Sequence, residues 1–235
     1  MIPRILHWVW LGPHELPERD REWMMGWRKH HPHWKLLIWA ESPEKCVLQG
    51  FETHLLPPLV NQRFYDGIEQ WVTGKAVLAS RSDIVRYEVV VRHGGIYVDT
   101  DVECFANIDS VLENVRLCVA DEWGPCPGNF LFGGIPNHPA LWTVVRELGP
   151  HLHGLGKAVG ALDATGPRYL APRMRAYQDA VIFPHMLFNP LCAFDDPDQV
   201  TRWPQVSLGN HRYDGKWYDR TKNPPPPEFR HEEGG

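Results

Sequence analysis

Gly94-Gly95-Ile96-Tyr97-Val98-Asp99-Thr100-Asp101-Val102 is the stretch of sequence from which the fold can be predicted. A pair of glycines precedes a short β-branched run, a pattern typical of a tight turn that leads into a strand. Side chains two residues apart in a strand point to the same face, so we predict Asp99 and Asp101 side by side, in line with Tyr97. Adjacent carboxylates repel each other. The pair therefore indicates a shared divalent cation, and carboxylate oxygens suit Mg²⁺ or Mn²⁺.

A helix is predicted directly before this stretch, from Lys75 to His93. Its apolar residues recur at spacings of three and four, and Gly94 is a natural residue to end it. Asp83 falls on the apolar stripe, where a carboxylate needs a partner. Arg86, three residues on, is within reach. The pattern leaves two interpretations open: an internal ion pair, or a pair that points into a pocket and holds the hydroxyls of a polar ligand.

The composition indicates a globular protein with a core. The chain has 235 residues, of which 43% are hydrophobic, and a formal net charge of −5 argues against a broad nucleic-acid surface. No signal peptide precedes Ile5, and no window approaches the roughly 18 apolar residues of a membrane span. We therefore expect a cytoplasmic protein whose association with membranes, if any, is peripheral. An odd number of cysteines without a CxxC pair predicts free thiols in a reducing compartment; they are Cys46, Cys104, Cys118, Cys126 and Cys192.

Strands and helices alternate along the chain, which predicts a single α/β domain over residues 1–220. The last residues, 221–235, are rich in proline and predict a disordered tail. Besides the stretch already quoted, strands are predicted at 5–10, 35–39, 115–120, 129–132, 181–183 and 206–208. Helices are predicted at 20–30, 43–49, 63–71, 75–93, 139–148 and 167–177, and a surface loop at 149–160.

Two further groups of residues are candidates for ligand contacts. Trp8 and Trp10 alternate with Val9, so both rings project from one face of the first strand. One of them is expected in the core, and Trp10, next to a Gly turn, is the candidate for stacking on a base. His211, Lys216 and Trp217 could close over a metal–diphosphate, although a His near a chain end is often structural. The chain contains no HExxH zinc motif, P-loop, GxGxxG or GxSxG pattern.

Taken together, these motifs resemble the DXD sugar-binding region glycosyltransferases of family 32. That family includes initiating α-1,6-mannosyltransferases and bacterial capsular polysaccharide transferases, and the catalytic domains of clostridial glucosylating toxins are distant relatives. The long spacing from Ser82 to Asp101 makes the resemblance specific, and it extends from residue 2 to about residue 217. The segments that carry it are 2–12, 31–39, 79–86, 94–101, 129–139, 165–167 and 211–217.

The resemblance implies a GT-A fold, in which a Rossmann-like, mostly parallel sheet is flanked by helices. It also implies retaining transfer of a hexose from a UDP- or GDP-sugar, with Mn²⁺ or Mg²⁺. By position, Trp10 would stack on the base, Asp83 and Arg86 would hold the donor sugar, and Tyr97 would line the nucleotide pocket. Asp99 would contact ribose and metal, Asp101 would ligate the metal, Asn129 would face the reacting sugar, and His211, Lys216 and Trp217 would contact metal and diphosphate. In the family's C-terminal His-x-Trp-x-x-Ser-Trp pattern, Tyr213 here replaces Trp and Lys216 replaces Ser.

No protein base is obvious in the sequence, so a β-phosphate oxygen of the donor is expected to take the acceptor's proton. A double-displacement route would need a carboxylate nucleophile, for which Asp121 or Glu122 could serve. The acceptor could be a glycan, a lipid-linked glycan or a protein, whereas the acidic balance argues against nucleic acid. Two other classes stay open: a metal-dependent nucleotidyltransferase or phosphodiesterase, and a catalytically silent scaffold that binds sugar nucleotides.

Overall fold

The structure is a computed structural model of the chain, and it describes residues 1–122, 127–191 and 204–213. Lys216, Trp217, two of the cysteines and the proline-rich tail at 221–235 lie outside the described residues. No helix in the described ranges has both the length and the apolar character that a membrane span requires.

The described residues form a mixed α/β fold, as the alternation of elements predicts. The strands are β1 (Ile5–Trp10), β2 (Lys35–Ala40), β3 (Glu52–Leu55), β4 (Gly95–Val98), β5 (Val102–Cys104), β6 (Leu117–Asp121), β7 (Pro127–Gly134), β8 (Ala180–Phe183) and β9 (Gly209–His211). The α-helices are α1 (Glu18–His30), α2 (Gln62–Asp66), α3 (Ala76–His93), α4 (Pro139–Gly154), α5 (Ala161–Ala164), α6 (Pro167–Arg175) and α7 (His185–Phe188). Three 3₁₀ turns lie at Pro43–Lys45, Ile68–Gln70 and Asp109–Leu112.

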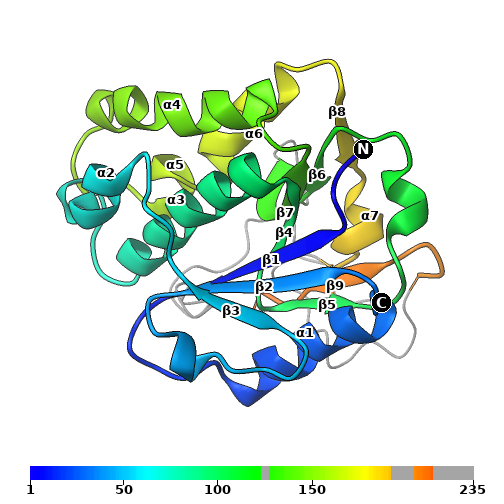
Figure 1. Ribbon diagram of the computed structural model, residues 1–235. Coiled ribbons are helices and arrows are strands. Elements are labelled where there is room, and N and C mark those ends of the chain that lie inside the picture. Colours follow the sequence, from blue (N-terminus) through cyan, green and yellow to red (C-terminus); the bar gives the residue numbers. More distant parts are fainter. Residues whose placement is uncertain (123–126, 192–203, 214–235) are drawn as a thin grey trace, which may run out of the picture.

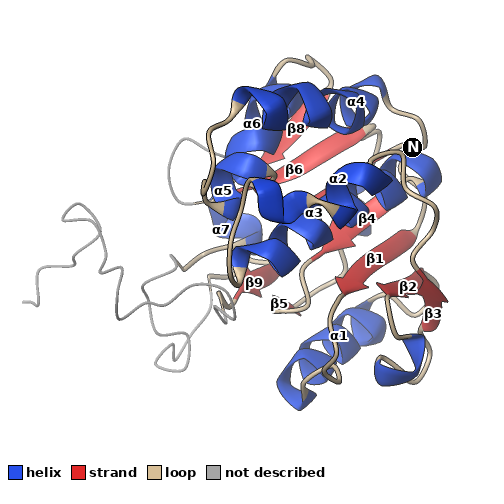
Figure 2. Cartoon of the chain, turned by 90° about the vertical axis from the view of Figure 1, so that its left-hand side faces the viewer, coloured by secondary structure: helices blue, strands red, loops and turns tan. Residues whose placement is uncertain are grey.

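Seven strands form the central sheet in the order β3-β2-β1-β4-β7-β6-β8, and most neighbours are parallel. Only β7 runs against its neighbours β4 and β6. The helices α3, α4 and α6 lie on one side of the sheet and α1 lies on the other (Figures 1 and 2). This is the GT-A-type arrangement that the family resemblance implies. A separate pair, β5 and β9, is antiparallel.

The central strand β4 divides the core into two clusters. Tyr97 packs into the cluster under α3, while Ile96 and Val98 belong to the cluster on the α1 side. This alternation is the two-residue period of a strand buried on both faces. Gly94 ends α3 with a φ of 65° and donates its N–H to the carbonyl of Val90 at 2.8 Å. The helix therefore passes through the two glycines directly into the strand, as predicted.

The paired carboxylates are the main local correction to the sequence analysis. β4 ends at Val98, so Asp99 and Asp101 lie in the turn before β5 rather than within a strand. A hydrogen bond from the Val102 N–H to the Asp99 carbonyl, at 3.2 Å, closes this turn. The two side chains still lie close together, but they do so because of the turn and not because of the pleat of a strand.

Other element boundaries also differ from the prediction. The segment 43–49 forms only a 3₁₀ turn, and α4 continues to Gly154 with Pro150 inside it, where a loop was expected. The late strand occupies 209–211 rather than 206–208, because its partner is β5 and not the main sheet. Four short elements, β3, β5, α5 and α7, were not predicted at all.

Candidate active site

A cavity of about 510 Å³ opens at the edge of the sheet where β1, β4 and β6 end. Because β1, β4 and β6 run in the same direction, their carboxyl ends meet at this edge, the usual ligand site of open α/β sheets. The polar residues that line the cavity are Lys75, Ser82, Asp83, Arg86, Tyr97, Asp99, Thr100, Asp101, Glu122, Asn129, His211 and Tyr213. They come from segments that are far apart in the chain.

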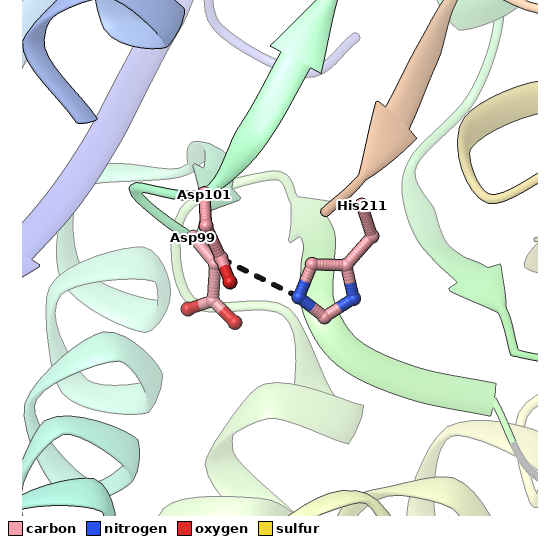
Figure 3. Close-up of side chains that lie close together, drawn as sticks. All are labelled: Asp99, Asp101 and His211. Atoms are coloured by element: carbon pink, nitrogen blue, oxygen red, sulfur yellow. Dashed lines mark ion pairs between the residues drawn. The ribbon is translucent and has the colours of Figure 1, made fainter. Parts of the chain in front are cut away.

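Asp99, Asp101 and His211 form a cluster at this cavity (Figure 3). One possible ligand atom from each residue can be chosen so that all three atoms lie within 4.8 Å of one another. The Nε2 atom of His211 lies 3.4 Å from Oδ1 of Asp101. The imidazole stacks on the ring of Phe130 with a centroid distance of 4.6 Å. The pairing of Val102 with His211 in the β5–β9 ribbon explains how a residue about 110 positions further along the chain reaches the turn.

The chemistry of this cluster fits a divalent cation. Burial opposes a charge on His211, but the carboxylates of Asp101, Asp99 and Glu122 outweigh that effect and raise the pKa of the imidazole. The site is therefore negative enough to favour a cation. Two carboxylates and one imidazole are ligands that Mn²⁺ accepts readily, and the carboxylates also suit Mg²⁺. The Nδ1 atom of His211 is buried and makes no hydrogen bond within the described part of the chain, so it does not fix the ring against reorientation.

Arg86 connects this cluster to the helix α3. Its guanidinium donates to the Asn129 carbonyl at 2.9 Å and lies 3.0 Å from an oxygen of Asp99 and 3.4 Å from an oxygen of Asp83. It also stacks over the ring of Tyr97, 4.3 Å from the centroid. Burial disfavours its charge, but the surrounding acids more than compensate and raise its pKa. The Asp83–Arg86 pair is therefore an internal ion pair that also lines the cavity, and its contact with ligand hydroxyls stays a prediction.

Asp83 is held by donors from three elements. Besides Arg86, it accepts hydrogen bonds from Nδ2 of Asn129 at 2.8 Å and from Oγ1 of Thr165 at 2.7 Å. Burial raises the pKa of Asp83 to about 6. The sequence analysis named Thr165 only within the segment 165–167 that carries the resemblance, so its contact with Asp83 was missed. The amide of Asn129 binds Asp83, so it orients this carboxylate as well as lining the cavity.

The remaining predicted residues are divided between the cavity, the core and the part of the chain that is not described. Trp10 lines the cavity and donates from its indole N–H to the His14 carbonyl at 2.9 Å, whereas Trp8 is fully buried in the core. Tyr97 lines the cavity and donates its hydroxyl to Asp99 at 2.6 Å. Glu122 lines the cavity, whereas Asp121, at the end of β6, is not one of the lining residues.

The fold and the cavity together define an α/β protein with an acidic centre whose residues could hold a cation. Residues 17–117 match the family described as "Glycosyltransferase sugar-binding region containing DXD motif". The matched residues include Asp83, Arg86, Asp99 and Asp101. This region of the chain is thus similar to the DXD-containing glycosyltransferases, and the resemblance drawn from the sequence is confirmed.

Curated relatives and solved structures agree with this family. The chain is 22% identical over 188 residues to inositol phosphoceramide mannosyltransferase 1 of Schizosaccharomyces pombe, covering 78% of this chain and 54% of that protein. It is 30% identical over 152 residues to inositol phosphoceramide mannosyltransferase 3 of the same organism, covering 63% and 37%. The chain therefore spans about half or less of the length of these relatives.

Solved glycosyltransferases share the fold at low identity. The glycosyltransferase PaToxG superimposes with a TM-score of 0.59 at 17% identity, covering 74% of this chain and 68% of that one. The UDP-bound glycosyltransferase domain of the YGT toxin gives a TM-score of 0.56 at 11% identity, covering 77% and 79%. These likenesses establish the GT-A-type fold of the chain.

Proposed function

We propose that this chain transfers a hexose from a nucleoside-diphosphate sugar to a hydroxyl group of a glycan, lipid-linked or protein acceptor, with retention of the anomeric configuration. The observation that carries the proposal is the continuous contact from Asp83 through Arg86 to Asp99, which joins a site for sugar hydroxyls to the Asp99–Asp101–His211 cluster. A nucleotide sugar needs both sites at once, because its diphosphate is anionic and its sugar presents hydroxyl donors.

Each residue has a defined task in this proposal. Asp99, Asp101 and His211 would hold Mn²⁺ or Mg²⁺, which supplies Lewis-acid stabilisation of charge on the departing diphosphate. Asp83 is buried and already fixed by three donors, so it can accept from sugar hydroxyls without moving. Arg86 neutralises Asp83 and Asp99 and keeps both carboxylates in place.

The nucleotide would occupy the rest of the cavity. Trp10 offers an aromatic surface at the end of β1, and Tyr97 together with Leu78 adds to the wall of the cavity. The contributions proposed for Lys216 and Trp217 fall on residues that the structure does not describe.

Mannose is the hexose to test first, because two of the similar curated proteins are called mannosyltransferases. A uridine donor is the second choice, because a structural neighbour was solved with UDP bound. These names also suggest an inositol-containing lipid as one acceptor to test, alongside polysaccharide and protein acceptors.

A thermal-shift screen of UDP- and GDP-sugars, with and without Mn²⁺, tests the proposal without knowledge of the acceptor. We expect one donor to raise Tm when Mn²⁺ is present and to have little effect after EDTA is added, because bound ligand stabilises the folded state. The same donor should then show slow release of free sugar. Pyrophosphate chemistry would instead favour a nucleotidyltransferase, and binding without turnover would favour a scaffold. If no sugar nucleotide binds, the proposal is wrong.

A further inference from the structure

The helix α1 carries a buried acid to which neither the sequence analysis nor the family resemblance assigns a task. Asp20 is fully buried, and Trp23 and Trp27 follow it at spacings of three and four residues on the same buried face of the helix. Burying a carboxylate is costly unless polar groups satisfy it. The first turn of α1 lowers that cost, because the helix dipole favours an acid there. The contacts of this face show what the acid does.

Asp20 contacts the turn that holds two of the candidate metal ligands. Its Oδ2 atom accepts a hydrogen bond from the hydroxyl group of Thr100 at 2.6 Å, although the two residues are 80 positions apart in the chain. This length is typical of a hydroxyl group that donates to a carboxylate. Thr100 is the residue between Asp99 and Asp101, and it lines the cavity with them. A bond to its side chain therefore limits the directions in which both neighbouring carboxylates can point.

The backbone on either side of the central residue of this turn is held by two other elements. The N–H of Asp99 donates to the carbonyl of Phe130 on β7 at 2.8 Å. The carbonyl of Asp101 accepts from the N–H of Arg212, which follows β9, at 2.9 Å. Asp20 supplies the third anchor, and it does so from α1 through a side chain. Three consecutive residues are thus each fixed by a different element, as expected of ligands that are held in place before an ion binds.

Two indoles on the same face of α1 hold the ribbon that follows the turn. Trp27 donates its indole N–H to the carbonyl of Val102 on β5 at 2.8 Å. The guanidinium of Arg212 lies over the ring of Trp23, 5.6 Å from its centroid. The packing of α1 on the ribbon therefore does not depend on Asp20 alone, and we expect variants of Asp20 to keep the fold.

We propose that Asp20 is a positioning residue of the cation site, which acts through the hydroxyl group of Thr100 to hold Asp99 and Asp101 in the orientation that binds the ion. This inference rests on the proposed function, to which the ion belongs. Without the bond, the turn has to be ordered at the moment when the ion binds. That entropy cost weakens the affinity for the ion, even though Asp20 itself does not touch it.

Titration of the full chain with Mn²⁺ alone, followed by the EPR signal of the free ion, tests the proposal without a donor or an acceptor. We expect Asp20→Ala to raise the Kd for Mn²⁺ about tenfold, the lower end of the usual effect of groups that orient metal ligands. Asp20→Asn should keep most of the affinity, because its amide oxygen can still accept from Thr100. Thr100→Val removes the same bond from its partly exposed side, so it should match Asp20→Ala and decides the question if that variant does not fold.

A double variant and a matched control separate positioning from a general loss of stability. Asp20→Ala combined with Thr100→Val should bind Mn²⁺ no more weakly than either single variant, because both remove one bond. Thr143→Val also removes a hydrogen bond of a threonine hydroxyl, to Tyr177 and away from the cavity, so it should lower Tm without changing the Kd. An Asp20→Ala chain with an unchanged Kd, or losses that add in the double variant, would overturn this inference and leave the proposed function intact. A wild-type chain that binds no Mn²⁺ would instead overturn the proposed cation site, and this inference with it.

Discussion

The two ends of β4 show opposite ways of using polar side chains. At its start, His7 is fully buried, and its Nε2 lies 2.7 Å from the Gly94 carbonyl while its Nδ1 accepts from the indole N–H of Trp39 at 3.1 Å. Because Nδ1 accepts, Nε2 carries the proton and donates it to Gly94. At the end of β4, the carboxylates of Asp99 and Asp101 lie close to the imidazole of His211, which can carry a positive charge.

The difference separates stability from function within one strand. Burial lowers the pKa of His7 to about 3, so the ring is neutral and both of its nitrogens are satisfied. Burial and the charge of Asp101 raise the pKa of Asp99, whereas Arg86, His211 and the hydrogen bond from Tyr97 oppose that effect. One end is fully paired within the protein, whereas the other groups two carboxylates and an imidazole in a set that could hold a cation. Four substitutions test this contrast, in order of expected effect.

Asp101→Asn should have the largest effect, and it should act on activity alone. Loss of one carboxylate weakens the cation site, and a catalytic metal supplies several kcal/mol of transition-state stabilisation, so transfer should fall by about 10³-fold. The fold should be retained, because the Asp101 side chain is not part of the core. The measurement is the rate of sugar transfer against Mn²⁺ concentration, with Tm as a check on folding. Asp66→Asn on α2, outside the cavity, is the control. An active Asp101→Asn enzyme would contradict the assignment of Asp101 as a ligand of a catalytic metal.

Gly95→Ala should have the next largest effect, and it should act on stability alone. Gly95 has a φ of +93°, and a Cβ there would lie 2.5 Å from the Ile5 carbonyl oxygen and 3.0 Å from Nε2 of His7. Strain from the positive φ and overpacking together predict a loss of about 3 kcal/mol in the free energy of unfolding. Gly74→Ala is the matched control, because Gly74 also has a positive φ of +61° but open space around it.

Urea unfolding of the two glycine variants separates strain from crowding. Gly74→Ala should lose only about 1 kcal/mol, the cost of the left-handed backbone itself. If both variants lose the same amount, the close approach of β1 to the diglycine turn is not what requires Gly95.

The contrast also explains which parts of the molecule the sequence could predict. The segment from Ser82 to Asp101 is contiguous, so its helix, its two glycines and its acids could be placed by spacing alone. His211 could be named as a candidate, but its position beside Asp101 could not be predicted by spacing, because the β5–β9 ribbon that brings them together pairs segments about 100 residues apart. Nothing in the sequence indicated that Thr165 contacts Asp83, since a Thr before Gly-Pro is typical of the start of a helix.

Glu122 was named in the sequence analysis, but the sequence alone could not distinguish it from Asp121. It stood beside Asp121 in a turn-rich stretch, and nothing local distinguished the two acids. The distinction depends on Gly128 and on the alternation of β6 and β7, which together direct only Glu122 into the cavity. The strand prediction for Asp99 and Asp101 failed for a similar reason. The hydrogen bond that closes their turn competes with extension of β4, and residue type alone does not decide between them.

Thr165→Val should have a smaller effect that is shared between activity and stability. Val keeps the shape of Thr but leaves Oδ2 of the buried Asp83 without one of its donors, at a cost of about 1 to 2 kcal/mol. Transfer should fall about tenfold if Asp83 must be held to receive the sugar. Thr143→Val is the matched control, because Thr143 bonds to the Tyr177 hydroxyl away from the cavity. It should lose stability without a change in kcat/KM. Equal losses of activity in both variants would contradict the positioning role of Thr165.

His7→Gln should have the smallest effect, and only a change of pH reveals it. The folded-state pKa of His7 is about 3 and its ordinary value is 6.5, so the unfolded chain binds a proton first as the pH falls. The wild-type chain should therefore lose about 1 kcal/mol of stability from this group between pH 7 and pH 5.5, and continue to lose it until the folded ring is protonated. Gln can donate to the Gly94 carbonyl as His7 does but does not titrate, so the variant's loss over that range should be smaller by this amount. Urea unfolding at several pH values measures the difference, while kcat/KM at neutral pH should be unchanged because His7 lies at the opposite end of β4 from the cation cluster. If the two chains lose stability in parallel, the neutral His7 contact is not a source of the protein's acid sensitivity.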